Sequence, residues 1–202
     1  MKKYLVPFDF TPITRNALEH ALSIAQTDPG EIIALHVAAN EEAKTEAVRD
    51  FEKLKAELET EGKKDYLTYE VVTGSIFKDL TKKAESAGVS LIIMGTHGAR
   101  GLQKLIGSNA IRVINNSQIP FIITQSRKPR PIKNILIPID LTKERILITK
   151  FASDIAQKFN AEIHLVYQQQ TDEFLKKRIK NNLSVVQKEL NKKNLKYCTE
   201  GR

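Results

Sequence analysis

An internal repeat divides this chain of 202 residues. When residues 2–31 are laid over residues 133–162 without gaps, ten of the thirty positions are identical. Self-similarity over this length indicates two related folding units. Just before the second copy, two prolines and three cations in residues 126–132 predict an extended, exposed linker. We therefore expect a domain at 1–127, a linker at 128–132 and an incomplete second domain at 133–202.

Short apolar segments alternate with amphipathic segments through the first unit. The apolar segments predict strands at residues 4–8, 32–37, 66–72, 89–94 and 121–124. The amphipathic segments predict helices that begin at residue 12 and cover 43–58, 76–84 and 108–115. Near-continuous apolar strands separated by amphipathic helices indicate a parallel sheet with helices on both faces. The first unit is thus predicted to have an α/β fold.

The second unit repeats only the beginning of this pattern. Its predicted strands lie at 134–139, 162–167 and 195–199, and its predicted helices lie near 142–158 and 175–190. The third helix, the last two strands and the glycine-rich segment of the first unit have no counterpart in it. An apolar strand that is left at the edge of a sheet invites pairing with another chain. We expect this unit to contribute to packing or association.

Three chemically distinctive segments follow predicted strands. They are Pro7-Phe8-Asp9, His36-Val37, and a glycine-rich run from Met94 to Gly101 that leads to Gly107-Ser108-Asn109. Ligands of parallel sheets bind beyond the carboxyl ends of the strands. Glycines let backbone N–H groups approach an anion, and a helix start adds unpaired N–H groups. The run contains neither a P-loop nor a dinucleotide fingerprint, so phosphate binding and simple tight turns both stay open.

The same segments resemble the universal stress protein family. The matching residues are Lys-Tyr-Leu-Val-Pro-Phe-Asp at 3–9, Ile-Ala-Leu-His-Val at 33–37, Ile-Ile-Met-Gly-Thr-His-Gly at 92–98, Gly107-Ser108, and Ile-Pro-Phe-Ile-Ile-Thr at 119–124. The resemblance implies a three-layer α/β/α sandwich of the Rossmann-like, adenine-nucleotide alpha hydrolase type. It also implies a five-stranded parallel sheet of order 3-2-1-4-5, here followed by a partial second copy. By that strand order, the first strand of the partial copy would be a bare sheet edge. Many family members form homodimers through the fifth strand, and members divide into ATP-binding and non-binding groups.

The resemblance also implies a site for ATP with Mg²⁺. In it, Asp9 would contact the ribose and help to order the metal, so the protein alone would hold no metal ion. Val37 would offer main-chain contacts to adenine. The full set of expected nucleotide-binding residues is Pro7, Phe8, Asp9, Val37, Met94, Gly95, His97, Gly98, Gly107, Ser108 and Asn109. Eight residues separate Gly98 from Gly107 where the family motif has nine, a departure that leaves nucleotide binding open.

Several of these residues also have purely structural interpretations. Asp9 can cap the following helix, because its counterpart Asp140 has no glycine-rich loop beside it. His36 is expected to pack within the sheet as a hydrogen-bonded group, and His97 can stabilise a turn. No Ser/His/Asp order, paired carboxylates or activated cysteine emerges from the sequence, so we do not expect an enzyme.

Charge and composition limit the partners and the location. The whole excess of +8 falls in residues 128–202, which hold 16 Lys and Arg against 8 Asp and Glu. We interpret it as a solvated Lys-rich helix face. The alternative, contact with nucleic acid, is weakly supported because few aromatic residues occur there to stack on bases: Phe151, Phe159, Tyr167, Phe174 and Tyr197. The chain has one cysteine, Cys198, no metal-ligand spacing and no apolar run long enough to span a membrane. We expect no signal peptide, because the sequence reaches Asp9 too soon for the apolar stretch of one. A cytoplasmic protein without a structural metal is expected.

Two functions follow as expectations. The first is an ATP-binding stress-response protein that forms a homodimer or another homo-oligomer, in which bound nucleotide controls its protein interactions. The second is a nucleotide-independent interaction protein of the same fold.

Overall fold

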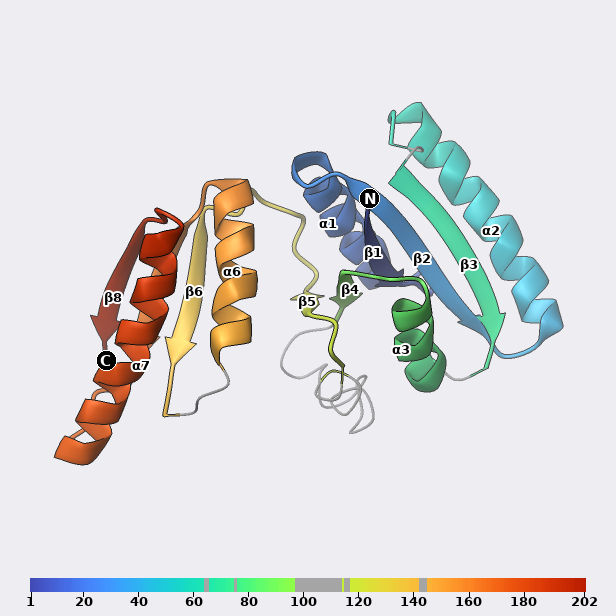
Figure 1. The fold of residues 1–202 in the computed structure, drawn as a ribbon. Helices are drawn as coiled ribbons and strands as arrows, with labels where there is room; N and C mark the ends of the chain where they lie inside the picture. Colours follow the sequence, from blue (N-terminus) through green and yellow to red (C-terminus); the bar gives the residue numbers. More distant parts are fainter. Residues whose placement is uncertain (64–65, 75, 97–113, 115–116, 142–144) are drawn as a thin grey trace. The chain divides into compact units, whose positions relative to one another are not determined.

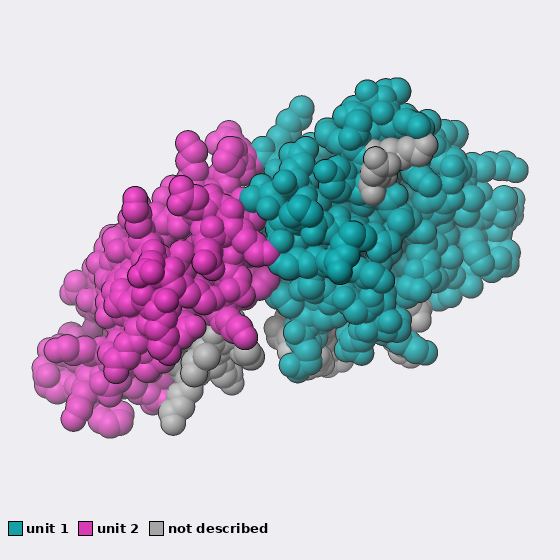
Figure 2. All heavy atoms as spheres, turned by 45° about the horizontal axis from the view of Figure 1, so that its top comes forward, with its two compact units in different colours: residues 1–129 teal, residues 130–202 magenta. Residues whose placement is uncertain are grey.

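The computed structural model describes residues 1–63, 66–74, 76–96, 114, 117–141 and 145–202. The chain forms two compact units, Met1–Pro129 and Arg130–Arg202, which are coloured separately in Figure 2. Each unit has its own parallel sheet and its own buried core.

Unit 1 is built on a five-stranded parallel sheet (Figure 1). Its strands are β1 (Lys2–Pro7), β2 (Gly30–Ala38), β3 (Leu67–Thr73), β4 (Leu91–Gly95) and β5 (Phe121–Thr124). Their spatial order is β3-β2-β1-β4-β5, and every neighbouring pair is parallel. This is the predicted order 3-2-1-4-5.

Helices cover both faces of this sheet, which confirms the layered α/β architecture (Figure 1). Helices α1 (Pro12–Thr27) and α2 (Glu41–Thr60) contact one face, and α3 (Ile76–Ser86) packs on the other. Alternation along the strands supplies apolar residues to each side. Leu5, Ile33 and Ile92 join the core beneath α3, whereas Phe51 of α2 is buried on the opposite face. The predicted helix at 108–115 lies outside the described residues except for Ile114.

Unit 2 has a three-stranded parallel sheet of order β6-β7-β8. The strands are β6 (Asn134–Ile139), β7 (Glu162–Tyr167) and β8 (Tyr197–Gly201), and the helices are α6 (Arg145–Phe159) and α7 (Glu173–Lys192). Both helices pack against one core, which contains Ile137, Ile163 and Leu190. β6 and β7 pair with Asn134 opposite Glu162, the same register as Lys3 opposite Glu31 at a shift of 131 residues. Strand β6 lies at an edge of this sheet.

The surface of α7 accounts for much of the positive charge. Its buried residues Ile179, Leu183, Val186 and Leu190 form one stripe. The lysines at 176, 177, 180, 188 and 192 are all exposed, as expected of a solvated helix face. None of the helices in the described ranges combines the length and the apolar character that crossing a bilayer requires.

Candidate functional site

The first candidate site lies where the strand order of unit 1 reverses. β2 and β3 lie on one side of β1, whereas β4 and β5 lie on the other. Asp9 follows the carboxyl end of β1, and Gly95 ends β4. The pairing of Leu5 with Ile92, counted onward, brings Phe8 level with Gly95. Crevices at such positions are where open α/β sheets bind ligands.

Asp9 is held by the start of α1. Its Oδ1 accepts hydrogen bonds from the Thr11 N–H at 3.1 Å, the Thr11 hydroxyl at 2.6 Å and the Thr14 hydroxyl at 2.8 Å. Thr11 is itself the N-cap of the helix. Partial burial alone would raise the pKa of the Asp9 carboxyl, but the hydrogen bonds from Thr11 and Thr14 outweigh it and the pKa lies below its ordinary value. The carboxylate is therefore charged at neutral pH.

Asp9 does not cap α1 itself but holds the N-cap residue Thr11, and this role is compatible with ligand binding. All three hydrogen bonds to its carboxylate use Oδ1, and within the described part of the chain no donor reaches Oδ2. One oxygen thus fixes the turn while the other is available to a hydroxyl group or a metal-bound water.

The residue after Asp9 has an unusual backbone conformation. Phe10 has a φ of +64°, in the left-handed region that bulky residues rarely adopt. Its ring lies 4.8 Å from that of Phe51 and 5.1 Å from that of Phe8. Backbone strain of this kind persists only where the surroundings impose it, and it gathers at functional sites. We name Phe8, Phe10, Phe51 and Tyr69 the aromatic cluster.

His36 supports this turn from β2. Its Nδ1–H donates to the carbonyl oxygen of Phe8 at 2.8 Å, and its half-buried ring lies 5.4 Å from that of Phe10. This contact agrees with the interpretation of His36 as a packed, hydrogen-bonded group. Phe8 itself is fully buried, so its side chain contributes to the site through packing.

Strand β2 continues beyond the end of β1, and Val37 lies in the part that continues. The last paired residues of the two strands are Pro7 and Leu35, and the Phe8 N–H donates to the Leu35 carbonyl. Alternate residues of a strand direct both backbone groups to the same neighbour. The N–H and C=O of Val37 therefore point toward the β1 side of the strand, beyond the last paired residue of β1. They place a backbone donor and a backbone acceptor next to each other. Pro7, the last paired residue of β1, is buried.

Gly95 and Met94 have packing roles at the end of β4. A Cβ on Gly95 would lie 2.6 Å from the carbonyl oxygen of Ile13, so glycine is required for β4 to approach the first turn of α1. Met94 packs against the core beneath α3. The next residue, Thr96, is buried and donates its N–H to the Thr124 carbonyl at 2.8 Å. The close approach of α1 thus explains why position 95 is a glycine, without any contact to phosphate.

The remaining predicted residues lie outside the described residues. They are His97, Gly98, Gly107, Ser108 and Asn109. Their contacts with phosphate stay predictions, as do the nucleotide contacts of the other predicted residues.

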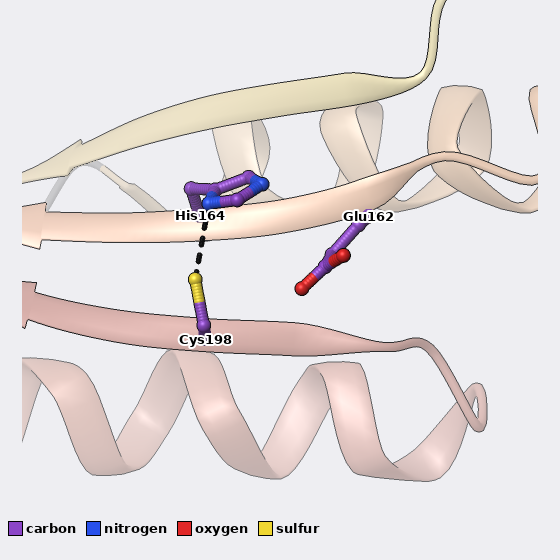
Figure 3. Close-up of side chains that lie close together, drawn as sticks. All are labelled: Glu162, His164 and Cys198. Atoms are coloured by element: carbon purple, nitrogen blue, oxygen red, sulfur yellow. Dashed lines mark hydrogen bonds between the residues drawn. The ribbon is translucent and has the colours of Figure 1, made fainter.

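Unit 2 contains a group of side chains that the sequence does not indicate as a site. Glu162, His164 and Cys198 offer ligand atoms that all lie within 4.8 Å of one another (Figure 3). They come from two adjacent strands separated in sequence by α7. Only the strand register reveals the group, because no short motif joins its members.

Comparisons with known proteins agree with the architecture. The model of the universal stress protein family matches residues 1–125. Universal stress protein MJ0531 of Methanocaldococcus jannaschii is 29% identical over 144 residues, which cover 63% of this chain and 84% of that protein. A solved universal stress protein from Archaeoglobus fulgidus shares the fold with a TM-score of 0.76 at 18% identity, covering 98% of this chain and 77% of that one.

A further solved structure is that of a universal stress protein in complex with cAMP. It has a TM-score of 0.50 and 16% identity, and it covers 62% of this chain and 98% of that one. Since the family model matches well over half of the 202 residues, and the predicted strand order is found, the chain belongs to the universal stress protein family.

Proposed function

We propose that unit 1 binds ATP with Mg²⁺ at the carboxyl ends of β1 and β4, and that the bound nucleotide controls interactions with partner proteins. The observation that carries this proposal is the turn at Asp9. A charged carboxylate stands at the reversal of strand order, with Oδ1 fixed by Thr11 and Thr14. Its other oxygen suits a ribose hydroxyl or a water of hydrated Mg²⁺, since that ion keeps several waters and takes few carboxylates.

The end of β2 supports the adenine half of the proposal. A purine edge presents a donor next to an acceptor, which matches the paired N–H and C=O of Val37 beyond the end of β1. The universal stress protein solved with cAMP is a protein of this fold with an adenine nucleotide bound. We propose binding without an enzymatic role, because the sequence shows no nucleophile beside a base and Asp9 is held by Thr11 and Thr14 in the turn before α1.

Calorimetric titration of Mg-ATP into the full chain tests this function. The wild-type protein is expected to bind. Asp9→Asn keeps an oxygen to accept from Thr11 and Thr14 but removes the charge, so affinity is expected to fall about tenfold or more, the value of a hydrogen bond to a charged group. Gly98→Val is expected to remove binding.

A matched control is Asp50→Asn, which removes a carboxylate paired with Lys53 on the exposed surface of α2 and should leave affinity unchanged. No heat of binding with a folded wild-type protein would refute nucleotide binding. It would favour the second candidate function.

The second candidate is interaction without a nucleotide, through self-association. It is favoured by unit 2, in which both helices pack on one face of the sheet and β6 forms an edge. Leu136 on this strand is 63% exposed. An edge strand with an exposed apolar side chain is a template for pairing, and a second copy of the chain supplies the same edge.

Light scattering on the full chain tests association. We expect a dimer whose mass falls toward that of the monomer in Leu136→Lys, because a charge on an edge strand opposes pairing. Ile148→Lys is the control, since Ile148 is 58% exposed but lies on α6. A monomeric wild-type protein would contradict the association, whatever the nucleotide titration shows.

A further inference from the structure

Strands β7 and β8 bring three different ligand types together. His164 and Cys198 are register partners on the two strands, and Glu162 lies two residues before His164, on the same face of β7. The Cys198 thiol donates to Nδ1 of His164 at 3.0 Å. Figure 3 shows the Glu162 carboxylate directed toward the same space between the strands. Glu162 and Cys198 are exposed and His164 is half-buried, so the group is open to solvent.

Asn134 of β6 orients the histidine. Its Oδ1 lies 3.1 Å from Nε2 of His164, and since an amide oxygen only accepts, Nε2 carries the proton. The lone pair of Nδ1 then faces Cys198. A metal-ligating histidine characteristically donates its other ring N–H to an oxygen, which fixes the tautomer and the ring orientation. Asn134 supplies this oxygen from β6, which pairs with β7 on the side opposite β8.

We propose that Glu162, His164 and Cys198 form a zinc-binding site, with Asn134 as the positioning residue for His164. Thiolate, imidazole and carboxylate are the three side-chain ligands that zinc takes, and three of them leave a fourth tetrahedral position for water. The soft sulfur ligand disfavours Mg²⁺ and Ca²⁺, which prefer oxygen. On binding, the thiol proton leaves to solvent as sulfur coordinates the ion, and the Nδ1 lone pair forms the second bond.

The cysteine and the histidine already lie close to the geometry of a bound site. With zinc–ligand distances of about 2.0–2.3 Å, tetrahedral coordination places sulfur and nitrogen about 3.6 Å apart. The thiol and Nδ1 are 3.0 Å apart, so they need to separate by only about half an ångström, which side-chain rotation provides. The bound ion would join β7 to β8 across their parallel pairing and thereby stabilise unit 2.

Titration of the reduced, untagged full chain with Zn²⁺, and separately with Co²⁺ as a spectroscopic substitute, tests the site. The wild-type protein is expected to bind one equivalent of Zn²⁺ and to show a thiolate-to-cobalt charge-transfer band. Cys198→Ala removes that band. Cys198→Ala and His164→Ala each weaken zinc binding by about 100-fold or more, since loss of a positioning partner alone costs about 10–100-fold. Asn134→Ala is expected to weaken zinc binding by about 10–100-fold and to keep the charge-transfer band.

Glu200→Gln is the matched control. Glu200 is a carboxylate on β8 two residues from Cys198, paired with Arg202 and outside the group of three ligands. Its replacement should leave zinc affinity unchanged. The proposal is overturned if the folded wild-type protein binds no Zn²⁺, or if Cys198→Ala binds it with the same affinity and stoichiometry. Neither outcome bears on the nucleotide proposal, which concerns unit 1.

Discussion

Replacing Phe51 with alanine is expected to destabilise unit 1 by about 3–5 kcal/mol, the usual cost of removing a buried aromatic ring. Phe51 is fully buried on α2. It stacks on Tyr69 with ring centroids 4.6 Å apart, and its ring also packs against Phe8 and Phe10 at 5.6 and 4.8 Å. Its loss therefore removes the member of the aromatic cluster that contacts all the others.

The effect of Phe51→Ala on nucleotide binding is expected to depend on Phe10. This residue keeps its left-handed φ of +64° because its ring is packed, and Asp9 lies immediately before it. Without Phe51 the turn can relax to an ordinary conformation, and Asp9 loses its fixed position. We therefore expect Phe51→Ala to weaken Mg-ATP binding even under conditions in which unit 1 is folded. Removal of a ring that reaches no ligand would then act on binding through the backbone.

Urea unfolding and nucleotide titration measure the two effects separately. Phe51→Leu should cost less stability because it keeps most of the buried volume, and Val48→Ala, on the same helix but 36% exposed, should change stability by about 0.5 kcal/mol or less. A Phe51→Ala protein that loses stability but binds nucleotide like the wild type would show that the aromatic cluster does not hold the Asp9 turn.

The fold of unit 1 could be predicted because its hydrophobic periodicity is strong and its strand order follows a family pattern. The strand starts were less predictable. The strands predicted to begin at Val89 and Leu195 begin at Leu91 and Tyr197. In both places the preceding helix ends in a Schellman motif, in which Val89 N–H donates to the Ala84 carbonyl and Leu195 N–H to the Leu190 carbonyl. The apolar residue belongs to the helix cap, although its sequence also suits a strand.

The candidate site shows a different limit of prediction. Asp9 could be found because it follows an apolar strand, but sequence could not decide between a cap and a ligand, and the structure shows one oxygen in the capping turn. Gly95 belongs to a glycine-rich run, yet its need for glycine arises from the Ile13 carbonyl, a contact across 82 positions of sequence that no motif records. The zinc ligands escaped detection for the same reason, because strand pairing sets their spacing.

The core of unit 2 makes a second large effect testable at Leu190. This residue is fully buried at the end of α7, among apolar residues that all come from unit 2, including Ile163 and Val186. Leu190→Ala is expected to cost about 2–5 kcal/mol. A unit of this size buries a limited core, so such a loss approaches its whole stability.

Because each unit has a separate core, Leu190→Ala should unfold unit 2 and leave unit 1 folded. Hydrogen exchange is expected to accelerate in β6 and β7 and to stay unchanged in β1 and β2. Val185→Ala, on the same helix but 52% exposed, is the control and should behave like the wild type. Zinc should restore part of the lost protection, since an ion that binds only the folded unit stabilises it. Equal acceleration of exchange in β1 and β2 would instead mean that the two cores unfold together. If unit 2 of the Leu190→Ala variant stays protected without zinc, the core around Leu190 does not determine the stability of this unit.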